Sequence, residues 1–247
     1  MKEKIYTIPV NEAFDENTEC PLCFLRQRFE KEQVDYALGA AMMEPDYRII
    51  SNEKGYCNRH YSMMLPKKEK LSLALVLETH LKEVREKIDS LSDTIVSMKE
   101  EKTGLFKKQK KSGVQTITDV ISTITDSCVI CEKLNYTMER YISVLFYLWE
   151  KESDFQEKFK NSKGFCLEHF KILSEACTKY LSKAKAVEFL EIIYKKETEA
   201  FERLNTEVHD FTLMFDYRNA GKKWGTEIDA PKRCCEKLSG YSFDNQN

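Results

Sequence analysis

Cysteine and histidine residues stand in four pairs along this chain, and two residues separate the members of each pair. Residues three positions apart in a tight turn or a first helical turn point the same way, so both can bind one ion. Two such pairs supply three thiolates and one imidazole, a set that tetrahedral zinc accepts. The sequence therefore predicts two Cys3His zinc sites from Cys20, Cys23, Cys57, His60, Cys128, Cys131, Cys166 and His169.

The four pairs form one pattern that occurs twice. The shift that carries Cys20 onto Cys128 also carries Cys23 onto Cys131, and after one inserted residue segment 54–57 matches 163–166. Self-similarity at a fixed offset indicates a duplicated unit. We therefore expect repeat unit 1 at 1–103, a Lys- and Gly-rich linker at 104–113, repeat unit 2 at 114–215, and a C-terminal docking segment at 216–247.

Other chemistry also fits these cysteines. An iron–sulfur cluster uses cysteine-rich sets, although its usual set has four cysteines. Dithiol redox chemistry uses Cys-x-x-Cys pairs, usually beside a βαβ pattern that this chain lacks. The Cys-x-x-Cys of one copy can share an ion with the Cys-x-x-His of either copy, and the spacing alone does not choose between these pairings.

The elements that must position the pairs are predicted to be helices. Only 8 glycines and 5 prolines occur in 247 residues, which disfavours a fold of many strands and turns. Each Cys-x-x-Cys opens a helix, which Pro45 is expected to end or bend in the first copy. A glycine then provides the turn into each Cys-x-x-His segment.

A long helix with a heptad pattern follows each Cys-x-x-His segment. Apolar residues recur at alternating spacings of three and four, and such a seam needs a partner helix. We expect an all-α, internally duplicated protein whose two long helices pack on each other, with self-association through the same seam as the alternative. The two seams are Ala74, Leu77, Leu81, Val84, Ile88, Leu91, Ile95 and Met98, and Val187, Leu190, Tyr194, Glu197, Phe201, Leu204, Val208, Phe211 and Phe215.

Composition and charge restrict the cellular location and the binding partners that can be expected. The net charge of −2 favours neither nucleic acid nor an anionic membrane surface. The basic run within 104–113 lacks arginine and has no stacking aromatic beyond Phe106, so it is expected to be a solvated linker. No stretch resembles a signal peptide or a membrane span, so we expect a cytoplasmic protein in a reducing environment.

The C-terminal segment brings polar, aromatic and glycine residues together without a helical period. One interpretation is a tail docked on the helical body, with Trp224 as an apolar anchor and Asp216 or Arg218 in an ion pair. The other is a ligand or partner site. The residues of that candidate site are Asp216, Tyr217, Arg218, Asn219 and Trp224.

The remaining candidates carry less chemistry. Cys177 and His80 are expected to be buried core residues, with a supporting or catalytic histidine as the alternative for His80. The adjacent Cys234 and Cys235 have poor geometry for binding one ion together. No catalytic serine–histidine–aspartate, phosphate-loop or dinucleotide motif occurs. We therefore predict a metal-stabilised binding or scaffolding protein rather than an enzyme, with an iron–sulfur or dithiol redox protein as the alternative.

Several blocks resemble a bacterial family of domains of unknown function. They are the opening 6–14 with Cys20-Pro21-Leu22-Cys23, the Gly55-Tyr56-Cys57-x-x-His60 segment, the helix over 73–81, and 215–219 with Trp224-Gly225. These blocks extend from the start of the chain to its end. The resemblance implies a stand-alone cytosolic protein of anaerobe-type bacteria and adds no mechanism.

Overall fold

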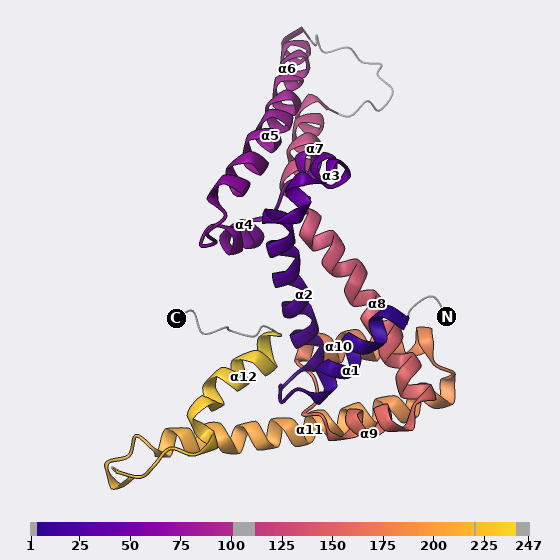
Figure 1. Ribbon diagram of the computed structural model, residues 1–247, viewed down its shortest axis with the longest axis vertical. Coiled ribbons are helices and arrows are strands. Elements are labelled where there is room, and N and C mark those ends of the chain that lie inside the picture. The colour runs from indigo at the N-terminus through magenta and orange to yellow at the C-terminus, as the bar shows by residue number, and fades with distance from the viewer. Residues whose placement is uncertain (1–3, 101–111, 220, 241–247) are drawn as a thin grey trace. The chain divides into compact units, whose positions relative to one another are not determined.

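The structure is a computed structural model that describes residues 4–100, 112–219 and 221–240. Within these ranges every regular element is a helix and no strand occurs (Figure 1). The all-α prediction is therefore confirmed. The chain divides into two compact units, unit 1 with residues 1–28 and 136–247 and unit 2 with residues 29–135. The boundaries between the units fall inside α2 (Pro21–Leu38) and α8 (Val129–Lys151). Each unit therefore contains residues from both halves of the chain.

Unit 2 consists of helices from the first half of the chain that pack on one another and on the start of α8. Helix α3 contacts η1 and α5, and α7 lies beside α5 and α6 (Figure 1). A core that includes Tyr47, Tyr56, Val76 and Ile130 holds these elements together. The elements are the end of α2 (Pro21–Leu38), η1 (Ala40–Met43), α3 (Pro45–Lys54), α4 (Asn58–Met64), α5 (Lys70–Asp89), α6 (Leu91–Glu100), α7 (Gly113–Thr125) and the start of α8 (Val129–Lys151).

Helix α2 ends earlier than the sequence suggested. It stops at Leu38 and is followed by Gly39, whereas Pro45 begins α3. Proline suits a first helical position because its fixed φ angle is helical and its missing N–H would have no partner there. The expectation that Pro45 ends this helix was therefore wrong, and Pro45 starts the next one.

Unit 1 has a core rich in aromatic side chains. Phe14 from α1 contacts Phe155 and Phe159 from α9, with ring centroids 4.9 and 5.7 Å apart. Phe189 from α11 packs on Phe159 at 5.4 Å. The elements are α1 (Lys4–Asp15), the start of α2, the rest of α8, α9 (Ser153–Asn161), α10 (Leu167–Tyr180), α11 (Lys183–Leu213), η2 (Tyr217–Asn219), η3 (Thr226–Asp229) and α12 (Ala230–Ser239).

The buried face of each long helix is displaced from the predicted heptad seam. In α5 the buried residues are Leu73, Val76 and His80, each one position before a predicted seam residue. In α11 the buried stripe has the same displacement at its start, and Tyr194 of the predicted seam is 68% exposed. The stripe of α11 is Ala186, Phe189, Ile193, Glu197, Ala200 and Leu204. Spacings of three and four without strict alternation are typical of a helix packed on a globular core.

The two long helices pack on neighbours within their own units. Helix α5 contacts α3, α6 and α7, and α11 contacts α10 and α12. The first predicted long helix is interrupted at Ser90, so that α5 and α6 follow one another. The packing of the two seams on each other stays a prediction.

The segment between the predicted repeats is only partly described. Of the linker at 104–113, residues 104–111 lie outside the described residues. Ser112 caps α7, because its side chain accepts a hydrogen bond from the Gln115 amide at 3.1 Å. In the described part of the chain, no helix combines the length and the apolar character that a bilayer crossing requires.

Candidate metal centres

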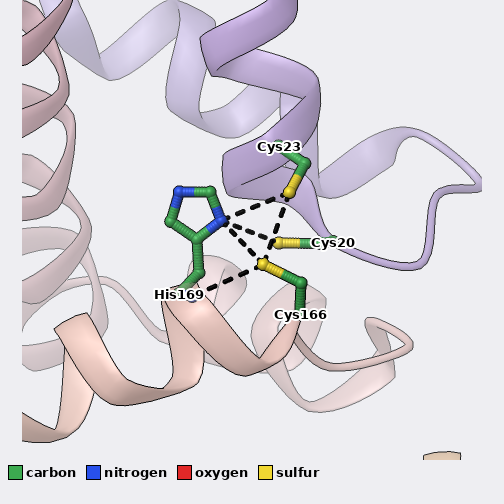
Figure 2. Close-up of side chains that lie close together, drawn as sticks. All are labelled: Cys20, Cys23, Cys166 and His169. Carbon is green, nitrogen blue, oxygen red and sulfur yellow. Dashed lines mark hydrogen bonds between the residues drawn. The ribbon is translucent and has the colours of Figure 1, made fainter. Parts of the chain in front are cut away.

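Cys20, Cys23, Cys166 and His169 come together in unit 1, and we call this group the Cys20 site. Nδ1 of His169 lies 3.4, 3.3 and 3.2 Å from the Sγ atoms of Cys20, Cys23 and Cys166 (Figure 2). The Sγ atoms of Cys23 and Cys166 are 3.5 Å apart. All four residues are buried, so the site is closed to solvent.

Cys57, His60, Cys128 and Cys131 form a second group in unit 2, which we call the Cys57 site. Nδ1 of His60 lies 3.2 Å from the Sγ atoms of Cys57 and Cys128 and 3.6 Å from that of Cys131. The Sγ atoms of Cys57 and Cys131 are 3.7 Å apart. Cys57 and Cys131 are only partly buried, so one side of this site faces solvent.

Each site combines half-sites from the two predicted repeats. The Cys-x-x-Cys of the first copy joins the Cys-x-x-His of the second in the Cys20 site, and the Cys57 site uses the complementary halves. This arrangement answers the question that the spacing left open. The ligands of one site are as far apart in sequence as Cys20 and His169, so a bound ion would join distant segments.

The ligands sit at helix N-termini. Cys57 and Cys166 occupy the N-cap positions of α4 and α10 with an extended backbone, and the Cys166 thiol also accepts a hydrogen bond from the His169 amide. Helices α2 and α8 begin one residue after Cys20 and Cys128. The positive end of a helix stabilises a nearby thiolate. Each site therefore has two helix N-termini directed at its sulfur atoms, which favours the anionic form that a metal requires.

A glycine turn delivers each Cys-x-x-His segment. Gly55 has φ of 62° and Gly164 has φ of 95°, values that side-chain-bearing residues rarely adopt. A Cβ on Gly55 would lie 2.3 Å from Nε2 of His80, and one on Gly164 would lie 2.6 Å from Oε1 of Glu197. The predicted glycine turns are therefore present, and each is closed by a buried polar side chain of the following long helix.

The ligand spacing fits one tetrahedral ion. Zinc–sulfur and zinc–nitrogen distances of about 2.3 and 2.0 Å place neighbouring ligand atoms roughly 3.5 to 3.8 Å apart. The distances between ligand atoms given above, 3.2 to 3.7 Å, are close to that range. The donor atoms of each group all lie within 4.8 Å of one another. Both groups can therefore hold a metal ion.

A buried carboxylate backs the histidine of the Cys57 site. Oε1 of Glu30 lies 3.0 Å from Nε2 of His60, and Arg59 donates two hydrogen bonds of 2.6 Å to the same carboxylate. Burial alone would raise the pKa of Glu30, but the bonds from His60 and Arg59 lower it to about 2. A carboxylate in this position fixes the imidazole with Nδ1 turned toward the ligand set.

Charge in the metal-free sites is shared between thiols and imidazoles. Burial opposes the charged form of His60, yet Cys128 and Glu30 raise its pKa to about 10. Burial likewise opposes ionisation of Cys128, but His60 lowers the pKa of that thiol to about 6. The pKa of His169 is also raised to about 10, by Cys166 and Cys20 against the effect of burial. Metal binding must therefore displace a proton from each imidazole.

Three polar residues near the sites were not assigned to them from the sequence. Glu30 follows Cys23 by seven positions on α2, and nothing in its neighbours marks it as buried. Lys237 was missed in the same way, since lysine is rarely fully buried. Glu197 did carry a signal, because it is the polar intrusion in an otherwise apolar seam.

The predicted partner residues near the C-terminus lie on an exposed turn. Asp216 accepts hydrogen bonds from the backbone and guanidinium of Arg218, and this contact lowers the pKa of Asp216. Asn219 donates to the carbonyl of Leu213 at 2.6 Å. Tyr217 is 86% exposed. Trp224 contacts the rings of Phe211 and Phe215 at 5.3 and 5.7 Å but is itself 42% exposed.

The other cysteines lie apart from the two ligand sets. Cys177 is fully buried in α10, in agreement with a core position, and its thiol donates to the carbonyl of Ser174. Cys234 on α12 is partly buried with its thiol 3.8 Å from the carbonyl oxygen of Leu204 on α11, and Cys235 is exposed. His80 is buried, and its Nδ1 lies 2.7 Å from the carbonyl oxygen of Asn52. These observations support the structural interpretation of Cys177 and His80.

The chain belongs to a family of unknown function, DUF6062, which it matches over residues 1–245. This match confirms the resemblance to a family of domains of unknown function. A search of curated proteins finds no match. None of the solved structures matches this chain either.

Proposed function

We propose that this protein is a zinc-stabilised helical binding module that catalyses no reaction of its own. The observation that carries the proposal is the pair of Cys3His sets, each with four donor atoms within 4.8 Å of one another. Four protein ligands leave no open coordination position for water or substrate, as in structural zinc sites. Because each ion would join segments distant in sequence, its binding energy would add directly to folding stability.

Zinc is favoured over an iron–sulfur cluster by the size of each ligand set. A cluster places several iron and sulfide atoms between its ligands, whereas these donor atoms surround a space suited to one ion. One histidine among three cysteines is also common for structural zinc. These features support two zinc ions per chain.

Metal analysis tests the proposal. The protein would be purified anaerobically, and its metal content and visible spectrum measured. We expect a colourless protein with about two zinc ions per chain, as two closed sets imply. A brown protein with visible charge-transfer absorption would contradict zinc and favour the iron–sulfur alternative. A metal-free protein with a reversible disulfide would favour dithiol redox chemistry.

The partner is proposed to be another protein, in the reducing cytoplasm. The exposed turn with Asp216, Tyr217, Arg218, Asn219 and Trp224 supports this, because aromatic residues and arginine are enriched at protein interfaces. Its internal hydrogen bonds fix the turn before any partner arrives, which lowers the entropic cost of binding.

Self-association through the heptad seam is the alternative use of an exposed surface. Leu81, Ile88 and Ile95 of the seam are 62, 48 and 47% exposed. Light scattering of the wild type and of a Leu81→Lys/Ile88→Lys variant distinguishes the two. A wild-type dimer that becomes monomeric in the variant would support the seam, and a monomer in both would contradict it.

Internal duplication is also part of the proposal. The two sites repeat the same local features: a glycine with positive φ, a cysteine at the N-cap position of a helix and a histidine three residues later. Exchange of half-sites between two copies would give the crossed pairing of ligands. A duplicated ancestor with two equivalent sites on paired units accounts for this arrangement.

A further inference from the structure

Lys237 is a fully buried lysine on α12, the last helix that the structure describes. A buried ammonium is costly unless a charge and hydrogen bonds replace its hydration. Its Nζ lies 2.6 Å from Oε2 of Glu197 on α11, and the carbonyl oxygen of Lys163 is 3.5 Å away. An ion pair therefore ties α12 to α11 beneath the turn at Gly164.

Glu197 connects this ion pair to the Cys20 site. Its other oxygen, Oε1, accepts a hydrogen bond of 2.5 Å from the amide of Phe165, the residue before Cys166. The side chain also fills the space where a Cβ on Gly164 would lie. Glu197 thus fixes the backbone that presents the Cys166 thiol to the other three ligands.

The C-terminal end of α12 covers the sulfur atoms of the same site. Gly240 ends the helix in the left-handed region, with φ of 71°, and its carbonyl oxygen lies 3.3 Å from Sγ of Cys23. A Cβ on Gly240 would lie 3.1 Å from Sγ of Cys166. The close approach of this glycine leaves the Cys20 site covered by α12.

We propose that Glu197 and Lys237 are positioning residues of the Cys20 site and that α12 is the clasp which retains its metal ion. The inference rests on the proposed function, since it concerns the same ligand set. Docking of α12 and occupancy of the site each favour the same arrangement of the Gly164 turn. By linkage, metal binding then raises the equilibrium constant for docking of α12 by a certain factor, and docking of α12 raises the affinity for the metal ion by the same factor.

Metal release from a Lys237→Met variant tests this clasp. Methionine keeps much of the side-chain volume but removes the charge, leaving Glu197 without its partner. The matched control is Lys232→Met on the same helix, where Lys232 is 40% exposed and 3.8 Å from Glu236. Both variants and the wild type would be loaded with two equivalents of zinc and challenged with a chromogenic chelator.

Loss of an outer-sphere partner typically lowers metal affinity about 10- to 100-fold. If that loss lies in the dissociation rate, one of the two ions should leave Lys237→Met faster by about the same factor. The second ion, at the Cys57 site, serves as an internal reference and should leave at the wild-type rate. Lys232→Met should match the wild type at both sites. Equal acceleration at both sites would indicate general destabilisation and would overturn the proposal, as would unchanged release.

A double variant separates the position of the turn from the buried charge. Glu197→Gln/Lys237→Met retains a carbonyl that can accept from the Phe165 amide and removes both charges. This double variant should release the ion of the Cys20 site more slowly than Lys237→Met alone. The unpaired carboxylate is gone, and the amide side chain still holds the turn. A double variant that releases its ion as fast as Lys237→Met would contradict a positioning role for Glu197.

Alkylation by iodoacetamide gives a reading that does not depend on metal. In metal-free protein, mass spectrometry should find Cys20, Cys23 and Cys166 modified faster in Lys237→Met than in Lys232→Met, with Cys57 unchanged. Unchanged protection of those three thiols would overturn the clasp. A wild-type protein that binds no zinc while its thiols follow this pattern would overturn the proposed function and the retention of an ion by α12, and would support only the protection of the Cys20-site thiols by Lys237.

Discussion

The Cys20 and Cys57 sites have the same ligand types in different surroundings. Every ligand of the Cys20 site is buried, whereas Cys57 and Cys131 of the other site are partly exposed. His60 has a carboxylate on the far side of its ring, while among the described residues no group hydrogen-bonds Nε2 of His169. Two sets of the same residue types therefore need not bind a metal ion equally well.

The two sites would hold a metal ion in different ways. At the Cys57 site, Glu30 orients the imidazole through a direct contact, and Cys57 and Cys131 are partly exposed. At the Cys20 site, Glu197 acts on the backbone before Cys166, and α12 excludes solvent. The Glu30 contact increases the basicity of the His60 imidazole. The cover by α12 restricts access of solvent and reagents to the Cys20 site and restricts the exit of a bound ion.

Removal of one ligand should have the largest effect. Cys57→Ser and Cys166→Ser should each lose one of two zinc ions and destabilise the whole fold by about 4 kcal/mol or more, because the ion joins distant segments. The melting temperature should fall by roughly 10 °C. Elemental analysis and thermal melting check both values. Cys235→Ser, at an exposed cysteine, is the control and should keep both ions. Unchanged melting and metal content in both ligand variants would rule out a structural metal.

Glu30→Gln should weaken only the Cys57 site. Loss of the carboxylate behind a metal-bound histidine is expected to reduce zinc affinity about 10- to 100-fold. Competition with a chelator of known affinity would measure this at both sites. The control is Glu12→Gln, since Glu12 also contacts an arginine at 2.6 Å but is exposed and distant from His60 in sequence. Equal weakening of both sites would remove the distinction between them.

Thiol reactivity should rank the two sites by exposure. In zinc-loaded protein, limited alkylation should modify Cys57 and Cys131 before Cys20, Cys23 and Cys166. We expect a rate difference of about tenfold, which corresponds to ~1.4 kcal/mol in the opening free energy. Mass spectrometry of peptides gives the order. Simultaneous modification of all five thiols would show that the cover over the Cys20 site has no protective effect.

The pH dependence should give the smallest difference. The pKa values of His60 and His169 are raised from 6.5 to about 10. The contacts between these protonated imidazoles and the thiolates therefore stabilise the folded, metal-free protein. This stabilisation is complete below about pH 6.5 and is lost as the pH rises through 10. Zinc must displace these protons, so its affinity should rise with pH up to about 10 at both sites. Glu30→Gln should flatten this rise at the Cys57 site alone. Titration calorimetry in buffers of different ionisation enthalpy counts the protons released, and an unaltered count in the variant would argue against the role of Glu30.

The sequence determined the local features of this protein. The members of each pair are separated by two residues, which is about one helical turn, so the four candidate ligand pairs and the helix starts beside them could be predicted. The need for positive φ at Gly55 and Gly164 also follows from local geometry. Scarce glycine and proline and long apolar patterns were sufficient for the all-α class, because these properties depend on neighbouring residues.

Tertiary structure alone decided which half-sites pair and which polar residues support them. Cys23 meets Cys166 across 143 positions, and no local rule selects that partner over Cys57. The one-residue displacement of the buried stripes has the same origin. The apolar pattern gives no reason to bury His80, and it includes Glu197 only as a polar intrusion; these side chains are buried where Asn52 and Phe165 provide hydrogen-bond partners. Burial of Glu30 and Lys237 likewise depends on charges supplied by distant segments, which the sequence does not place.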